Sequence, residues 1–68
     1  MFKISLEAAR RNAKLTQKEF AELLGVSNST VCNWENGVSF PNAEQIDRIC
    51  ELVGLPYDHI NFLPNNPF

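Results

Sequence analysis

Small amide and hydroxyl side chains gather in one short stretch of this 68-residue chain, between Ser27 and Asn36. An asparagine amide carries a hydrogen-bond donor beside an acceptor, and a serine or threonine hydroxyl can act as either. Such groups suit recognition of another molecule through directed hydrogen bonds. Covalent chemistry is not indicated, because the sequence shows no nucleophile paired with a base, no phosphate-binding glycine loop and no metal-ligand cluster. The sequence therefore predicts a binding protein that is not an enzyme and needs no cofactor.

The cysteines do not indicate a metal site or a disulfide framework. Cys32 and Cys50 are only two and lack the spacing of zinc ligands, and the single histidine, His59, is remote from Cys32 in sequence. We interpret Cys50 as a small buried apolar side chain. Cys32 lies within the polar stretch, where a redox-sensitive thiol is a second interpretation.

Helix-start and helix-stop signals define the elements that must position the polar stretch. A first helix runs from a cap at Ser5 to about Ala13. A second helix begins at Thr16, which forms a capping-box pattern with Glu19 three residues later. Gly25 ends this helix at a position where the left-handed conformation is common.

Two more helices follow. Ser27 caps the third helix, whose inward residues Val31 and Trp34 leave the amide side chains on the outer face. Asn42 caps a fourth helix, and one further turn is expected at 56–60. The inner face of the fourth helix has apolar residues at helical spacing, namely Ile46, Ile49, Cys50 and Val53. No segment shows strand alternation, so we expect an all-α, compact bundle of four to five short helices.

The charges are unevenly distributed, although the net charge is only −2. Residues 1–34 carry five basic and three acidic side chains, whereas residues 35–68 carry one basic and five acidic side chains. The positive charge thus accompanies the first three helices, where an anionic partner would need it. No apolar run approaches the roughly 20 residues that span a bilayer. The N-terminus has no signal-peptide core, so we expect a cytoplasmic protein without a membrane segment.

Residues 16–37 have the outline of two helices joined by a tight turn. This pattern resembles the Cro/C1-type helix-turn-helix family, the lambda-repressor-like or XRE proteins, over about residues 4–60. The residues that carry the resemblance are Gln17, Ala21, Gly25, Val26, Ser27, Val31, Trp34, Glu35 and Gly37. The resemblance implies a helix-turn-helix DNA-binding domain over residues 1–63, followed by a tail at 64–68. It also implies a sequence-specific, repressor-like transcriptional regulator of bacterial or phage type.

The resemblance further implies roles for individual residues. A recognition helix at about 28–36 would lie in the major groove of double-stranded DNA. Contacts with base edges are expected from Asn28, Ser29 and Asn33. Contacts with phosphates are expected from Gln17, Lys18, Ser27, Thr30, Asn36 and Lys14. Arg10 and Glu35 are expected to form a structural ion pair between the first and third helices.

The loop after the third helix departs from the family pattern, because residues 38–45 carry no positive charge. Because contacts between cations and phosphates supply much of the affinity for DNA, we expect each monomer to bind DNA with modest affinity. We therefore expect a homodimer on a palindromic operator, where two copies multiply the contacts. Phe62 and Leu63, with Phe68, are spare apolar groups for a partner surface, and folding back onto the fourth helix is the other interpretation. An antitoxin-like or antirepressor-like protein-interaction module with weak or no DNA binding remains the alternative function. The acidic C-terminal half and the uncharged loop motivate it.

Overall fold

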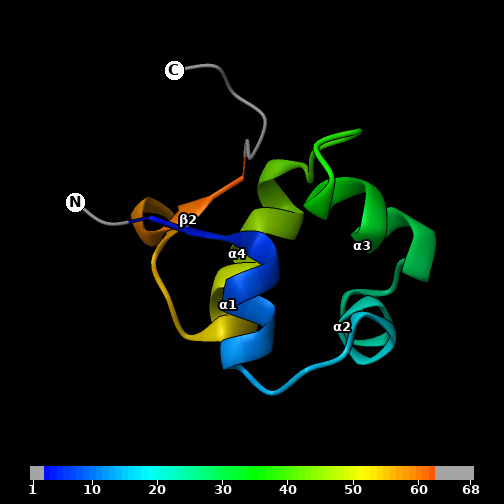
Figure 1. The fold of residues 1–68 in the computed structure, drawn as a ribbon, viewed down its shortest axis with the longest axis horizontal. Helices are drawn as coiled ribbons and strands as arrows, with labels where there is room; N and C mark the ends of the chain where they lie inside the picture. The colour runs from blue at the N-terminus through cyan, green and yellow to red at the C-terminus, as the bar shows by residue number, and fades with distance from the viewer. Residues whose placement is uncertain (1–2, 63–68) are drawn as a thin grey trace.

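The computed structural model describes residues 3–62. Leu63, Phe68 and the expected tail at 64–68 lie outside the described residues. The described part contains four α-helices, which are α1 (Leu6–Asn12), α2 (Gln17–Leu24), α3 (Asn28–Glu35) and α4 (Ala43–Val53). A 3-10 turn, η1 (Tyr57–His59), follows at the position of the predicted extra turn. Figure 1 shows α1 and α4 near the centre, with α2 and α3 together on one side. The predicted bundle of short helices is confirmed.

Two short strands join the beginning and the end of the described chain. β1 (Ile4–Ser5) and β2 (Ile60–Asn61) pair in parallel, with Ile4 opposite Ile60 and Ser5 opposite Asn61. The expectation that no segment forms a strand was therefore wrong. Strands of two residues are too short to show alternation in a sequence. The pair supplements the helical bundle and leaves the fold class unchanged.

Reciprocal hydrogen bonds confirm the predicted helix starts. Thr16 Oγ1 accepts the N–H of Glu19 at 3.1 Å, and Glu19 Oε1 accepts the N–H of Thr16 at 2.9 Å. Asn42 and Gln45 form the same arrangement at 2.8 Å in both directions. The bonds from Thr16 lower the pKa of Glu19. These bonds therefore stabilise the folded state fully at a pH above the ordinary pKa of a carboxyl group. The stabilisation is lost as the pH falls through the lowered pKa of Glu19.

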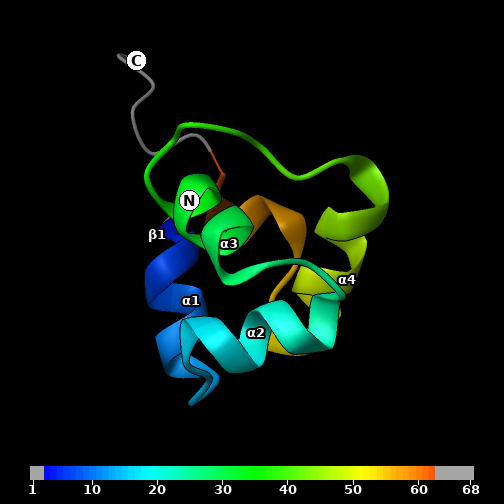
Figure 2. The same cartoon turned by 90° about the vertical axis from the view of Figure 1, so that its right-hand side faces the viewer.

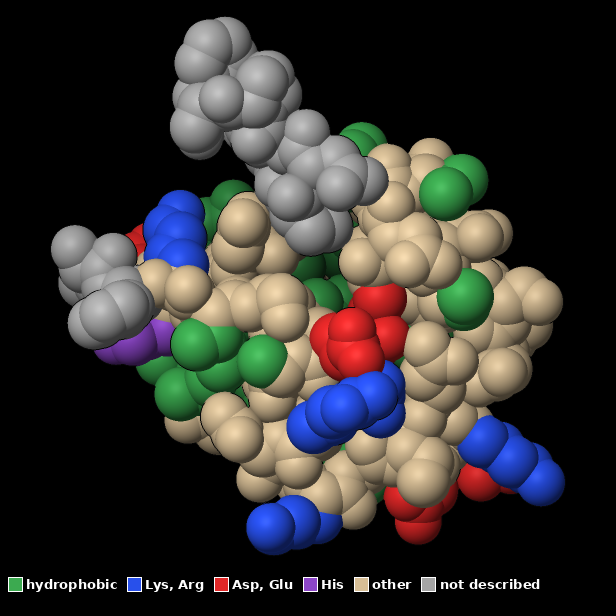
Figure 3. Space-filling view, in the orientation of Figure 1, with side chains coloured by type: hydrophobic (Ala, Val, Ile, Leu, Met, Phe, Trp, Pro, Cys, Tyr) green, Lys and Arg blue, Asp and Glu red, His purple; other side chains and the backbone are tan. Residues whose placement is uncertain are grey.

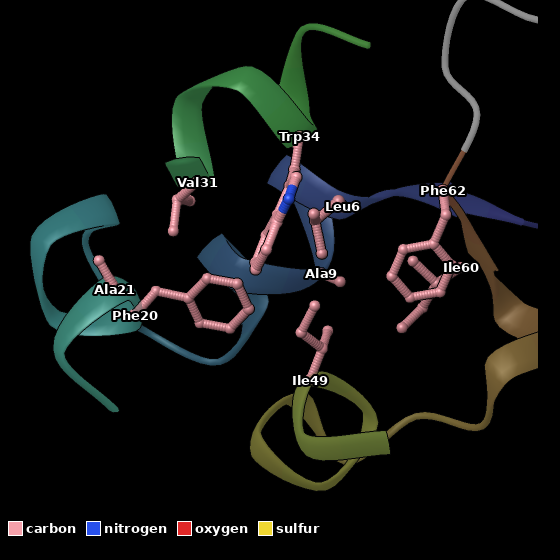
Figure 4. Packing of buried hydrophobic residues seen from close by; sticks show 9 residues of the cluster. All are labelled: Leu6, Ala9, Phe20, Ala21, Val31, Trp34, Ile49, Ile60 and Phe62. Carbon is pink, nitrogen blue, oxygen red and sulfur yellow. The ribbon is translucent and has the colours of Figure 1, made fainter. Parts of the chain in front are cut away.

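The core lies where the four helices face one another. Phe20 and Trp34 are 0% and 3% exposed, and Figure 4 shows their rings pointing from α2 and α3 toward the same centre. The other buried apolar residues are Leu6, Ala9, Ala21, Val31, Ile49, Ile60 and Phe62. Because α2 and α3 each contribute two of these side chains, the core holds both helices in a fixed relation.

Phe62 corrects one expectation about the partner surface. Its side chain is only 8% exposed and belongs to the core, next to Ile60 (Figure 4). The ring also stacks on Tyr57, with 5.6 Å between the ring centroids. The interpretation of Phe62 as a free apolar group for dimerisation was therefore wrong, because the ring is already buried within its own chain.

Gly25 ends α2 with φ of +72°, a conformation that favours glycine. A Cβ added there would meet nothing within 4 Å, so the cost of Gly25→Ala is conformational and not steric. We expect this change to lower the free energy of unfolding by about 1–2 kcal/mol. Urea denaturation should show a lower midpoint with an unchanged slope. Gly25→Asn should lose less, since asparagine enters this region more readily; equal losses would contradict the explanation.

Candidate nucleic-acid interface

The turn between α2 and α3 determines how α3 is presented. After Gly25, the N–H of Val26 donates to the carbonyl of Ala21 at 3.0 Å. Ser27 then caps α3, because its Oγ accepts the N–H of Thr30 at 3.1 Å. In Figure 2 the helix α3 lies on the face toward the viewer, above α2. The turn thus directs the outer face of α3 away from the body of the domain.

The three residues predicted to contact bases lie on this outer face. Asn28, Ser29 and Asn33 are all exposed. Ser29 and Asn33 are four residues apart, so they are neighbours on one face of the helix. Within residues 3–62, the side chains of the three residues make no hydrogen bond to another residue. Their donors and acceptors are therefore available to an external partner.

Hydroxyl groups predicted to contact phosphate lie at the start of α3. The oxygens of Ser27 and Thr30 are 2.9 Å apart, so one hydroxyl donates to the other. At the opposite end of α3, Asn36 Nδ2 donates to Cys32 Sγ at 3.3 Å. The predicted phosphate contacts thus occupy both ends of an eight-residue helix.

The remaining predicted phosphate contacts come from α2 and the connection before it. Lys18 is exposed in the first turn of α2, and Lys14 is exposed with φ of +65°. Gln17, the first residue of α2, behaves differently: its Nε2 donates to Glu35 Oε1 at 2.9 Å. No local pattern predicts this bond, because 18 residues separate Gln17 from Glu35 in the sequence.

Arg10 and Glu35 form the ion pair expected from the resemblance. Arg10 Nε lies 2.7 Å from Glu35 Oε2, and the two side chains are 7% and 5% exposed. Arg10 Nη1 also donates to the carbonyl of Leu15 at 2.9 Å. Because both charges are buried, removing one partner would leave the other without compensation, even where the pair adds little net stability. The pair therefore fixes the end of α3 against α1.

Neither cysteine is paired in a disulfide. Cys32 and Cys50 are free thiols of intermediate burial. Desolvation raises the pKa of Cys50, and the carboxylate of Asp47 adds to the effect. Among residues 3–62, no group of three or more His, Cys, Asp or Glu side chains is placed to hold a metal ion. No helix in the same range is long and apolar enough to cross a membrane.

The surface around α3 is polar but uncharged. No residue between Ser27 and Trp34 carries a formal charge. In Figure 3 the upper right of the visible face, over α3, shows neither basic nor acidic side chains. Val38 and Phe40, in the loop after α3, are 71% and 56% exposed. The face therefore offers hydrogen bonds and some apolar surface, but no formal charge between Ser27 and Trp34.

A family model described as a helix-turn-helix domain matches residues 4–61. The antitoxin PezA of Streptococcus pneumoniae serotype 4 is 36% identical over 53 residues, which are 78% of this chain and 34% of that protein. The HTH-type transcriptional activator BcrR of Enterococcus faecalis is 32% identical over 59 residues, or 87% of this chain and 29% of that protein. The chain thus spans only about a third of the length of these relatives. No solved structure is significantly similar to it. The extent of the family match and the capped α2–turn–α3 unit show that the chain belongs to the helix-turn-helix DNA-binding family, of the Cro/C1 type.

Proposed function

We propose that this domain is a sequence-specific regulator of transcription whose helix α3 enters the major groove of an operator. The supporting observation is that three side chains of α3 are exposed and make no hydrogen bond within residues 3–62, namely Asn28, Ser29 and Asn33. The inner face of the same helix is buried. An asparagine amide matches the N6 donor and N7 acceptor of adenine. The proposal therefore includes at least one A·T pair in each half of the operator. Members of this family are normally not enzymes.

Phosphate contacts would orient α3 in the groove. Ser27 and Thr30 at its start, and Gln17 and Lys18 from the first turn of α2, supply hydroxyl, amide and ammonium donors. The backbone N–H groups at the start of α2 add further donors and a favourable dipole. Such contacts fix the register of a protein on DNA without reading its sequence.

The small number of cations predicts a weak salt dependence of binding. Lys14 and Lys18 are the two lysines proposed to meet phosphates. Each neutralised phosphate changes the slope of log affinity against log salt concentration by about −0.9. We therefore expect a slope of about −2 for one copy and about −4 for two copies on a palindrome. Fluorescence anisotropy over a salt series measures the slope, and Lys18→Ala should reduce its magnitude by about one per copy. A slope twice as steep would show that other cations make the contacts.

Selection of bound duplexes from a random pool tests the proposed function directly. The expected result is enrichment of a palindromic site with A·T pairs in each half. Failure to enrich any sequence at low salt would overturn the proposal. A reporter gene carrying the selected site would then test repression against activation.

A homodimer on this palindrome would need a partner surface other than Phe62, which is buried. Val38 and Phe40 are exposed apolar side chains in the loop that directly follows α3. They replace Phe62 as apolar groups that a second copy could cover. Sedimentation of the protein with and without the selected duplex would show whether two copies assemble only on DNA.

A protein partner is the second candidate function. One relative is an antitoxin, and the outer face of α4 carries acidic residues at helical spacing, Glu44, Asp47 and Glu51, all exposed. A stoichiometric complex with a protein, combined with no enrichment of any duplex, would favour this function over DNA recognition.

A further inference from the structure

The carboxylate of Glu35 connects the buried framework to the proposed DNA-binding face. Its Oε2 accepts Arg10 Nε at 2.7 Å. Its Oε1 accepts Gln17 Nε2 at 2.9 Å and lies 3.4 Å from Arg10 Nη2. Arg10 belongs to α1, Gln17 begins α2 and Glu35 ends α3. Three helices therefore meet at one carboxylate whose side chain is 5% exposed.

Gln17 keeps part of its hydrogen-bonding capacity in this arrangement. A glutamine carboxamide is planar and has two N–H donors and one carbonyl oxygen. The bond to Glu35 uses one N–H and so restricts the direction of the other, which has no partner within residues 3–62. The side chain is only half-buried and lies in the first turn of α2. A donor at this position adds to the first-turn N–H groups that the capping box of Thr16 and Glu19 leaves unpaired.

We propose that Glu35 is a positioning residue for DNA binding: it holds the Gln17 carboxamide so that its second N–H meets a backbone phosphate. This inference rests on the proposed function and adds a role for a buried residue that does not reach DNA. The bond from Arg10 holds the orientation of the Glu35 carboxylate, and the carboxylate in turn holds the orientation of the Gln17 carboxamide. A free glutamine side chain would lose rotational freedom on binding, whereas here that freedom is lost on folding. The buried ion pair then supports the binding face as well as the fold.

A cycle of variants of the full chain tests the coupling between the two residues. In the native background, Gln17→Ala should weaken binding to the selected duplex about tenfold, since a bond to a charged phosphate is lost. In a chain carrying Arg10→Met and Glu35→Leu, apolar side chains replace the buried pair. Binding there should also be about tenfold weaker, and Gln17→Ala should add less than about twofold. The losses should be equal on an unrelated duplex, because a phosphate contact does not read sequence.

Lys18→Ala is the matched control, because Lys18 lies beside Gln17 in sequence and has no bond to Glu35. Its effect should be the same in both backgrounds. Thermal unfolding followed by circular dichroism establishes that each variant is folded. If the double replacement does not fold, Glu35→Gln serves instead: it keeps the shape but replaces one acceptor oxygen with an NH2 group, so Gln17→Ala should again add little.

The outcomes separate this inference from the proposed function. A tenfold loss from Gln17→Ala in both backgrounds, or no loss in the native chain, would overturn the positioning role while DNA recognition stands. A native chain that binds no duplex would overturn the proposed function itself. Non-additive losses for Gln17 with additive losses for Lys18 would support the role of Glu35.

Discussion

Replacing both Asn28 and Asn33 with alanine should remove the preference for the operator and leave weak, general DNA binding. Each bidentate amide–base contact discriminates by about 1–3 kcal/mol, so two contacts correspond to about 2–6 kcal/mol. Both side chains are exposed and make no hydrogen bond within residues 3–62, so the fold should be unaffected. Anisotropy titrations against the selected duplex and an unrelated duplex measure the two affinities separately.

Asn12→Ala provides the control for this prediction. Asn12 is also an exposed asparagine, but it ends α1 outside the helix-turn-helix unit. Its replacement should change neither affinity. An equal loss on both duplexes from the Asn28 and Asn33 replacements would instead assign these side chains to phosphates, because phosphate contacts carry no sequence information directly.

Phe20→Ala should have the largest effect on stability. Phe20 is fully buried, and its ring points from α2 toward the centre of the core (Figure 4). Replacing a buried phenylalanine with alanine costs about 3–5 kcal/mol, through lost burial and a residual cavity. That loss is a large fraction of the free energy of unfolding of a typical domain, which is about 5–15 kcal/mol. Fluorescence of Trp34, the single tryptophan, reports unfolding directly because its side chain is buried in the same cluster.

Leu23→Ala on the same helix is the comparison for Phe20→Ala. Leu23 is 46% exposed, so its truncation removes less buried surface and should cost less than about 1 kcal/mol. Both variants shorten a side chain on α2, but only Phe20→Ala removes a side chain that is packed in the core. A shift of the urea midpoint for Leu23→Ala as large as that for Phe20→Ala would contradict this account of the core.

Features that depend on neighbouring residues were predictable from the sequence. The capping pairs of Thr16 with Glu19 and Asn42 with Gln45 involve residues three positions apart, and both form. The left-handed end of α2 at Gly25 is also local. Hydrogen bonds between residues three or four positions apart leave a short pattern in the sequence. The starts of α2 and α4 and the end of α2 could therefore be predicted from that pattern.

Features that join distant residues were not predictable in the same way. The pairing of Ile4 with Ile60 depends on the folded bundle, since two-residue strands have no pattern of their own. Arg48 Nη2 donates to the carbonyl of Leu23 at 2.9 Å across 25 positions. The base and phosphate contacts of the interface remain predictions, because they depend on a DNA partner and not on the chain alone.

The pairing of β1 with β2 has a consequence for how this domain can be built into a larger protein. The strands lie on the side of the bundle away from α3 (Figure 1). Because the two strands run parallel, a segment that precedes Ile4 and a segment that follows Asn61 leave the pair at its opposite ends. Domains with adjacent ends tolerate fusion and insertion well. A module attached before Ile4 would thus start on the side away from α3 and leave the exposed face of that helix accessible.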